Sequence, residues 1–185
     1  MNTFDLFSLK GKNVLITGGR AMYGQGATMA LADAGANIYV ASHSVESAKD
    51  FCENLSKEKG VKVQAVAFDQ GDIESIEKMV EFVVEDAGSL DVFVHCSRII
   101  PKGHGGVGWT EDEEALEANV KVNSAASLYL LEMVGKQMIK QRKGSIVVFG
   151  SMYLGVVALL PILCGKFIPG AAGLAIGGTS VIIVI

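Results

Sequence analysis

The segment Asn13–Gly35 restricts the fold of this chain more than any other, because it joins a short apolar run to a helical pattern through a turn punctuated by glycines. Glycines let a backbone turn sharply and come close to a pyrophosphate. The N–H groups and the positive dipole end of the following helix attract the phosphate charge. The segment therefore predicts a strand–turn–helix unit that binds a dinucleotide, with an ordinary unit that holds no ligand as the alternative.

The glycines of this turn fit two registers. In the first, Gly24 and Gly26 form the close pair; in the second, Gly18 opens the turn and Gly24 is its last glycine. The helix should end near residues 34–36, where Ala-Gly-Ala precedes the next apolar run, and the second register then leaves a helix of normal length. Gly18 and Gly24 are therefore predicted to form the phosphate-binding turn, with Met22 where a smaller residue is usual.

Short strand-like runs and helical patterns alternate through the first 150 residues. The expected strands are Asn13–Thr17, Asn37–Ala41, Val61–Ala67, Asp91–His95 and Ser145–Phe149. The expected helices span about residues 24–34, 45–58, 73–87 and 111–139. Repeated strand–helix units predict an α/β fold, a Rossmann-like doubly wound parallel sheet with helices on both faces. Ligands of such sheets bind at the carboxyl ends of the strands.

Composition excludes several classes of protein. The 185 residues, half of them apolar, suffice for one domain with a hydrophobic core. The net charge of -4 and the lack of a Lys/Arg cluster argue against nucleic acid or an anionic membrane surface as the main partner. Three cysteines, with Asp5 and Lys10 interrupting the N-terminus, fit neither a disulfide framework nor a secretory signal. The expected location is the cytoplasm.

Polar residues follow the expected second and third strands. Ser42 and His43 stand where an NAD-preferring site usually places a carboxylate for the adenosine ribose. Without that carboxylate a 2′-phosphate is not repelled, and His43 and Arg20 can supply positive charge, so the pattern favours NADP over NAD. A solvated loop is the alternative. Asp69 can accept a hydrogen bond from the adenine amino group, or serve as a turn residue next to Gly71.

Further motifs follow in a regular order. They are LKGKNVLITGG from Leu9, Ala-Gly-Ala at residues 34–36, Asp69, GSLDVFVH before the end of the fourth strand, VKVN around Asn123, and GSIVVFGS leading to Ser151. In this order and spacing, the sequence from about Leu9 to Ser151 resembles the short-chain dehydrogenase/reductase family. The resemblance implies an NAD(P)-dependent oxidoreductase that moves a hydride between the nicotinamide and a carbonyl or alcohol carbon.

The resemblance also implies roles for individual residues. Ser151 matches the serine that hydrogen-bonds the substrate oxygen, and Asn123 matches the asparagine that supports a proton-relay water. The expected cofactor-binding residues are Gly18, Arg20, Tyr23, Gly24, Ser42, His43, Asp69, Gln70, Cys96 and Ser97. Family members often form oligomers through the long fourth helix, here residues 111–139. No metal site is expected, since the adjacent His95 and Cys96 on a strand point to opposite faces.

Two departures from the family pattern bear on activity. Arg98, like Met22, is a bulky residue on the expected cofactor path. The family's catalytic tyrosine and the lysine four residues after it should fall near Cys164 and Ile168, but no tyrosine in the chain is followed four residues later by lysine, and Lys166 precedes the expected position. Two classes of function are therefore predicted. One is an oxidoreductase impaired as written, and the other is a catalytically silent nucleotide-binding or interaction protein.

The composition changes abruptly after Ser151. Lys166 is the only charged residue among the last 34. The predicted division is a dinucleotide-binding domain over residues 1–151 and an apolar tail over residues 152–185 that packs on or continues the same domain. A change of reading frame just after Ser151 would explain the simultaneous loss of charge and family pattern, and would leave the fold truncated relative to the family.

The end of the tail has further interpretations. Phe167–Ile185 is uncharged and long enough to cross a membrane as a helix. Its four glycines and one proline make a poor membrane helix, so a core-packed or partly disordered tail is favoured. The apolar run Ser180–Ile185 is expected to form a buried strand.

Overall fold

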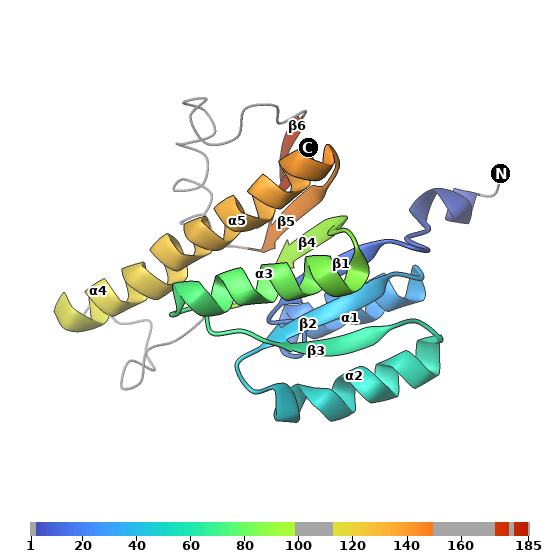
Figure 1. Cartoon of the computed structure of the whole chain (residues 1–185), viewed down its shortest axis with the longest axis horizontal. Helices are drawn as coiled ribbons and strands as arrows, with labels where there is room; N and C mark the ends of the chain where they lie inside the picture. The colour runs from blue at the N-terminus through green and yellow to red at the C-terminus, as the bar shows by residue number, and fades with distance from the viewer. Residues whose placement is uncertain (1–2, 99–112, 150–172, 178–179, 185) are drawn as a thin grey trace.

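The computed structural model describes residues 3–98, 113–149, 173–177 and 180–184. Strands and helices alternate along the chain as the sequence predicts (Figure 1). The elements are η1 (Thr3–Phe7), β1 (Asn13–Thr17), α1 (Met22–Asp33), β2 (Asn37–Ser42), α2 (Val45–Lys59), β3 (Val63–Ala67), α3 (Ile73–Ala87), β4 (Val92–His95), α4 (Glu113–Val120), η2 (Lys121–Ala125), α5 (Ala126–Gln141), β5 (Ser145–Phe149), β6 (Gly173–Gly177) and β7 (Ser180–Val184). The largest differences from the expected bounds are of two residues: α1 begins two residues earlier, β3 begins two residues later, and α5, the last part of the expected fourth helix, ends two residues later.

The strands form one sheet in the order β3-β2-β1-β4-β5-β7-β6. The first five strands pair in parallel, which confirms the predicted doubly wound parallel sheet. β7 pairs antiparallel with β5 and with β6. The expected strand over residues 180–185 is therefore observed as β7, between β5 and the edge strand β6.

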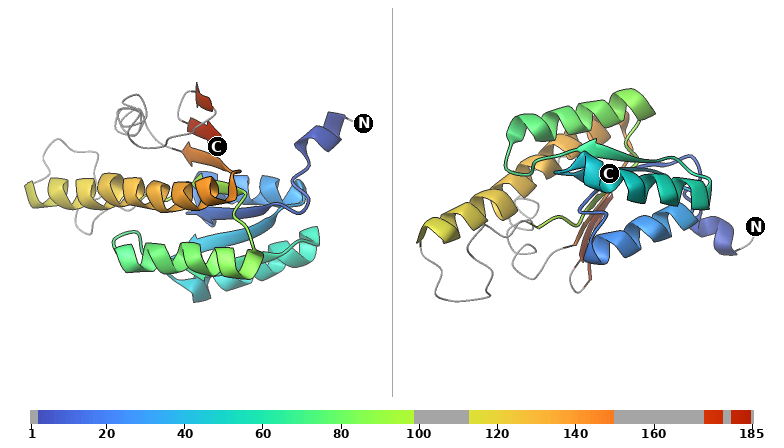
Figure 2. Two further views of the ribbon diagram at one scale, coloured as in Figure 1. Left: turned by 45° about the horizontal axis from the view of Figure 1, so that its top comes forward. Right: turned by 90° about the horizontal axis from the view of Figure 1, so that it is seen from below.

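Helices cover both faces of the sheet (Figure 2). α3 and α5 pack on one face in a core cluster that includes Leu15, Phe93 and Leu130. On the other face, the cluster beneath α1 and α2 includes Ile16 and Ile38. All five residues of β1 are buried, which explains why this strand reads as a continuous apolar run rather than an alternating one.

Local signals in the sequence set the ends of two helices. Asp72 caps α3, because its side chain accepts a hydrogen bond from the Glu74 N–H at 3.0 Å. Ser44 caps α2 in the same way by accepting from the Ser47 N–H at 3.3 Å. α2 ends at Gly60, whose φ of 67° is the left-handed conformation that glycine adopts without strain.

The expected fourth helix is a long helix in three parts. α4, η2 and α5 follow one another without a break, and η2 is a π-helical turn in which the Ala126 N–H bonds the Lys121 carbonyl. A π turn adds one residue to a helical turn, and such turns are frequent at functional sites. In the part of the chain that the structure describes, no helix combines the length and apolar character needed to cross a membrane.

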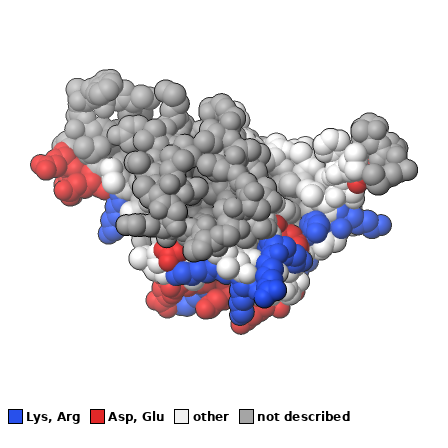
Figure 3. Space-filling view, turned by 90° about the horizontal axis from the view of Figure 1, so that it is seen from above, with Lys and Arg blue, Asp and Glu red and all other residues white. Residues whose placement is uncertain are grey.

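The amino ends of the strands carry polar clusters that join the helices to the sheet. Asp91 accepts from the Asn13 N–H at 3.1 Å and from Lys143 Nζ at 2.9 Å. Nearby, the Tyr39 hydroxyl donates to Asp86 Oδ2 at 2.7 Å, and Lys62 pairs with the same carboxylate. Acidic and basic side chains lie beside one another on the face shown in Figure 3, so no single sign of charge dominates its described part.

A crevice lies at the opposite edge of the sheet, where the strands have their carboxyl ends. β1 and β4 are neighbours, although two strands and three helices separate them in the chain. The first three strands therefore extend the sheet from β1 outward to β3, and the chain then crosses back so that β4 lies on the other side of β1. Such a reversal leaves a crevice outside the carboxyl ends of the two central strands. Gly18, which follows β1, and Ser97, which follows β4, meet there.

Candidate nucleotide-binding site

The turn after β1 depends on Gly18. Its φ is +68°, a conformation that other residues rarely adopt. A Cβ at Gly18 would lie 2.9 Å from the backbone carbon of Cys96 and 2.9 Å from the backbone nitrogen of Ser97. The absence of a side chain therefore lets the turn after β1 rest directly against the end of β4.

The contacts of Gly24 decide between the two registers. A Cβ at Gly24 would lie 2.1 Å from the Gly18 carbonyl oxygen, whereas a Cβ at Gly26 would meet nothing within 4 Å. Gly24 thus lets α1 pack closely on the turn, and Gly26 is a solvent-exposed helical residue. The geometry agrees with the register in which Gly18 and Gly24 form the turn.

Thr28 holds the same turn from within the helix. Its buried hydroxyl lies 2.7 Å from the Gly19 carbonyl oxygen and 2.8 Å from the Gly24 carbonyl oxygen. Sequence reasoning missed this residue. The available signal was its place four residues after Gly24, from which a threonine hydroxyl can bond the carbonyl one helical turn back.

The N-terminus of α1 faces the crevice without a side-chain cap. Its N-cap residue is Ala21, which offers no capping hydrogen bond. Helix N-terminal amides left uncapped by side chains attract anions, helped by the helix dipole. The turn and this helix end together present uncapped backbone N–H groups to the crevice, and phosphate binding there stays a prediction. Met22 is the first residue of α1, and its side chain lies outside the described part of the structure.

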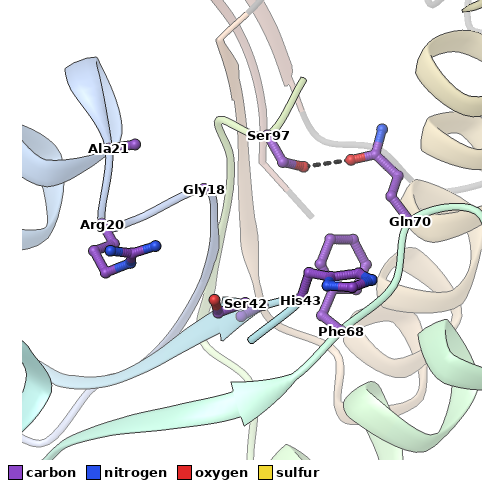
Figure 4. Close-up of a pocket in the computed structure, with 9 residues that line it drawn as sticks. Gly18, Arg20, Ala21, Ser42, His43, Phe68, Gln70 and Ser97 are labelled. Atoms are coloured by element: carbon purple, nitrogen blue, oxygen red, sulfur yellow. Dashed lines mark hydrogen bonds between the residues drawn. The ribbon is translucent and has the colours of Figure 1, made fainter. Parts of the chain in front are cut away.

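A pocket opens beside this turn (Figure 4). Its lining residues are Gly18, Arg20, Ala21, Ala41, Ser42, His43, Phe68, Gln70 and Ser97. Six of these are among the ten residues predicted to bind a cofactor. Arg20 lies on the side of the glycine turn, the Ser97–Gln70 pair on the opposite side, and Ser42 and His43 at the end of β2. Four separate segments, which follow or end β1, β2, β3 and β4, thus contribute polar groups to one pocket.

The lining residues that the sequence did not single out are Ala21, Ala41 and Phe68. All three lie at or beside the end of a strand or the start of α1, and they are apolar or small. They carry no chemical signal of their own in the sequence. Phe68 is buried and follows β3, so its ring forms an apolar wall to one side of the polar groups.

The pocket lining contains two basic residues. Arg20 and His43 line it, and no carboxylate does so among the described residues. Asp69 stands just outside, where its Oδ2 lies 3.7 Å from His43 Nε2. Its Oδ1 accepts a hydrogen bond from the Gly71 N–H at 2.8 Å, so the turn role considered for Asp69 is present in the structure. A contact from Asp69 to adenine stays a prediction.

Three other predicted cofactor contacts lie outside the pocket lining. Tyr23 is 78% exposed on the first turn of α1, and Gly24 is occupied in packing that turn. Cys96 is partly buried, and burial raises the pKa of its thiol to about 11, so the thiol is protonated at neutral pH. Arg98, expected on the cofactor path, is exposed. Direct cofactor contacts by Tyr23 and Cys96 therefore stay predictions.

Beneath the pocket, four side chains and both the side chain and the backbone N–H of Ser97 form a closed ring of hydrogen bonds. The Ser97 hydroxyl donates to Gln70 Oε1 at 2.6 Å, and Gln70 Nε2 donates to the Ser127 hydroxyl at 3.2 Å. Ser127 Oγ lies 3.0 Å from His95 Nε2, and His95 Nδ1 lies 2.8 Å from Thr17 Oγ1. The Ser97 N–H donates to Thr17 Oγ1 at 3.4 Å and closes the ring. We call these residues the polar ring.

His95 is the titratable member of the polar ring. Its side chain is 2% exposed, and burial lowers the pKa of its imidazole to about 4, so the imidazole is neutral at physiological pH. Either neutral tautomer satisfies both neighbours, because each hydroxyl can donate or accept. The sequence did not predict roles for Thr17 or Ser127, whose partners lie far away in the chain.

The predicted catalytic residues are placed only in part. Asn123 lies within the π-helical segment η2, and its Nδ2 donates to Asn119 Oδ1 at 3.1 Å. Gln70 Nε2 reaches the same segment by donating to the Val122 carbonyl at 2.9 Å. Ser151 lies outside the described residues, as do the positions near Cys164 and Ile168.

Comparisons with known proteins agree with this geometry. The family model described as short chain dehydrogenase matches residues 12–159. The chain is 34% identical over 151 residues to an NADP-dependent mannitol dehydrogenase from Hypocrea jecorina, covering 80% of this chain and 56% of that protein. It is 29% identical over 167 residues to a sorbose reductase from Candida albicans, covering 86% and 56%. The chain thus spans just over half the length of these relatives.

Solved structures give the same result for the fold. An NADPH-dependent 3-quinuclidinone reductase from Rhodotorula rubra superposes with a TM-score of 0.73 at 25% identity, covering 88% of this chain and 65% of that one. The family match extends over most of the chain and includes every element of the glycine turn and pocket. The parallel sheet, the glycine turn and the matched residues together show that this chain belongs to the short chain dehydrogenase family.

Proposed function

We propose that this chain binds NADP(H) in the pocket and is an oxidoreductase of a carbonyl or alcohol substrate. The observation that carries the proposal is the charge of the pocket. Arg20 and His43 stand with Ser42 beside the phosphate-binding turn, and no described carboxylate lines the pocket. NADP differs from NAD by a 2′-phosphate on the adenosine ribose, which a basic, carboxylate-free site accommodates. NAD is the alternative cofactor.

Different groups of described residues suit different parts of the proposed cofactor. The turn of Gly18 and Gly24, with the uncapped N-terminus of α1, suits the pyrophosphate. Arg20, Ser42 and His43, which line the pocket, suit the 2′-phosphate, and Gln70 and Ser97 are proposed to face the adenosine. The bound cofactor supplies the hydride. The protein's part in the described region is to hold the phosphates and to fix the orientation of the adenosine half.

The sequence contains only some of the catalytic residues that the family uses. Ser151 is proposed to hydrogen-bond the reacting oxygen, and Asn123 to support a proton-relay water. No tyrosine is followed four residues later by lysine, so the family's proton donor is missing from the sequence. That absence favours a second candidate function, a nucleotide-binding protein without turnover. Self-association through the long helix α4–α5 is a separate proposal, which sedimentation velocity would test.

Loss of the Arg20 guanidinium is expected to weaken NADPH binding about 10- to 100-fold while changing NADH binding less than about threefold. A charge-assisted hydrogen bond contributes about 1.5–3 kcal/mol, and only NADPH carries the phosphate that would receive it. Titration calorimetry of Arg20→Ala with both cofactors measures the two changes. Lys140→Ala, which removes one exposed cation from the last turn of α5, is the control. Equally weakened binding of both cofactors would show that Arg20 does not bind the 2′-phosphate.

The chain as written is expected to turn over any carbonyl substrate only in trace amounts. A positioned general acid contributes about 10²–10⁴-fold, so a typical kcat of about 10 s⁻¹ should fall below about 0.1 s⁻¹. The names of the relatives direct the assay to sugar alcohols and keto sugars: mannitol, sorbose and 5-keto-D-gluconate. NADPH oxidation is followed by absorbance. Turnover at ordinary rates that Ser151→Ala abolishes would refute the expectation, whereas binding without turnover supports the second candidate.

A further inference from the structure

The polar ring joins the wall of the pocket to the helix that carries Asn123. Gln70 and Ser97 line the pocket, whereas Ser127 belongs to α5 and His95 to β4. The ring is therefore one hydrogen-bonded unit shared by the nucleotide pocket and the long helix. None of its members is exposed to solvent, and four of the five, all but Ser97, are buried.

Gln70 is the member with the most contacts. Its carboxamide accepts from Ser97 Oγ and uses Nε2 to donate both to Ser127 Oγ and to the Val122 carbonyl. Its side chain is only 2% exposed. A buried carboxamide with all of these bonds made has one preferred orientation, because a flip would turn Gln70 Oε1 towards the Val122 carbonyl oxygen and set one acceptor against another. The position of the Val122 carbonyl is thus tied to the position of the Ser97 hydroxyl.

The bond to Val122 falls on the one irregular turn of the long helix. η2 spans Lys121–Ala125, and Asn123 is the next residue after Val122. A π turn is less stable than an ordinary α-helical turn and commonly persists because surrounding contacts support it. Gln70 supplies one such contact from the end of β3, across the crevice.

Closure of the polar ring restricts the movement of Gln70 relative to the long helix. His95 bridges Ser127 and Thr17, and Thr17 immediately precedes the glycine turn. The same Thr17 hydroxyl accepts from the Ser97 N–H. Hydrogen bonds in a buried network polarise and strengthen one another. A displacement of the pocket wall must therefore either break a ring bond or carry the η2 turn with it.

We propose that Gln70 is a positioning residue that couples occupation of the dinucleotide pocket to the order of the π turn holding Asn123. The inference rests on the proposed function, because the ligand is the proposed NADP(H). Filling the pocket fixes Ser97 and Gln70 against the adenosine half of the cofactor. Gln70 then holds the Val122 carbonyl and Ser127, and the turn between them becomes less mobile. Asn123 is then held more firmly with a cofactor bound than without one.

Hydrogen exchange of the full-length chain tests the coupling. Amides of residues 119–127 are followed with and without saturating NADPH, and the ratio of the two exchange rates is the readout. In the wild type, NADPH is expected to slow exchange about tenfold or more. In Gln70→Met, which keeps the length of the side chain but none of its hydrogen bonds, the ratio is expected to fall below about twofold. NADPH should bind this variant at most about tenfold more weakly, as for one lost hydrogen bond.

Two further variants keep the test decisive. Ser127→Ala removes the second contact of Gln70 with the long helix and should lower the ratio in the same way, even where Gln70→Met does not fold. Tyr39→Phe removes a hydroxyl that bonds Asp86 at the opposite edge of the sheet, and should leave the ratio at its wild-type value. A purely structural role for Gln70 would raise exchange equally in the free and bound states, which the ratio does not register.

The outcomes separate the two proposals. If wild-type chain binds NADPH without protecting residues 119–127, or if both ring variants keep the full ratio, the coupling is wrong while the cofactor proposal stands. If the wild-type chain binds neither NADPH nor NADH, the proposed function fails and the coupling fails with it. Protection that is lost in both ring variants and kept in Tyr39→Phe supports the coupling.

Discussion

Gly24→Ala is expected to lower the free energy of unfolding by about 3 kcal/mol and to weaken NADPH binding about 100-fold or more. The added Cβ would stand 2.1 Å from the Gly18 carbonyl oxygen, a contact between two backbone-fixed atoms that side-chain rotation cannot relieve. α1 must therefore move away from the turn, and overpacking of this kind costs about 1–3 kcal/mol or more. The same movement takes the helix N-terminus away from the phosphates. Urea denaturation and calorimetric titration measure the two effects.

Gly26→Ala is the matched control, two residues further along the same helix. A Cβ there meets nothing within 4 Å, and the residue is an exposed glycine inside α1. Alanine should therefore raise the free energy of unfolding by about 0.5–1 kcal/mol, since glycine is the poorer helix former. NADPH affinity should change little. Reversed effects of the two substitutions would mean that Gly26, rather than Gly24, belongs to the turn.

Acid is expected to destabilise the protein between pH 6.5 and pH 4 through His95. Its pKa is about 4 in the folded chain against 6.5 in the unfolded chain. Between these values the unfolded chain binds a proton that the folded chain does not, so stability falls as the pH is lowered. The shift corresponds to a loss of about 3 kcal/mol, complete by about pH 4 and absent above pH 6.5. Urea denaturation at a series of pH values measures it.

His95→Gln is the comparison for this pH profile. A glutamine amide can replace the imidazole Nε2 in its contact with Ser127, but it does not titrate. The carboxylates titrate equally in both proteins, so the difference between the two stability curves isolates His95. The variant should lack the slope between pH 6.5 and pH 4. Parallel curves over that range would show that His95 is accessible to protons in the folded state.

Much of the fold was predictable because its signals are local. The strands are short apolar runs, and Asp72 is a helix cap. The register of Gly18 and Gly24 could be chosen by counting back from the expected end of the helix. The starts of α1 and β3 and the end of α5 were each missed by two residues. At α1 the helix begins directly after Ala21, without the polar cap that would have marked it.

The site was predictable only where a residue carries its own chemistry. Arg20 and His43 were expected because charge after a glycine turn or a second strand is informative. Ser127 was not, because a serine in an apolar helix acquires meaning only from His95 and Gln70, which lie 32 and 57 residues away in the chain. Phe68 was missed for the same reason, since its role as a pocket wall depends on the neighbouring strands.

The pairing of β1 with β4 also bears on the order in which this protein folds. Gly18 and its neighbours acquire their pocket only after the end of β4 has docked against them, across 78 residues of chain from Thr17 to His95. Contacts between residues so distant in sequence form slowly, because a long loop must close first. The β1–α1 unit can collapse early by itself, whereas the pocket appears only with the central strand pair. Nucleotide binding would therefore report that the centre of the sheet has finished folding.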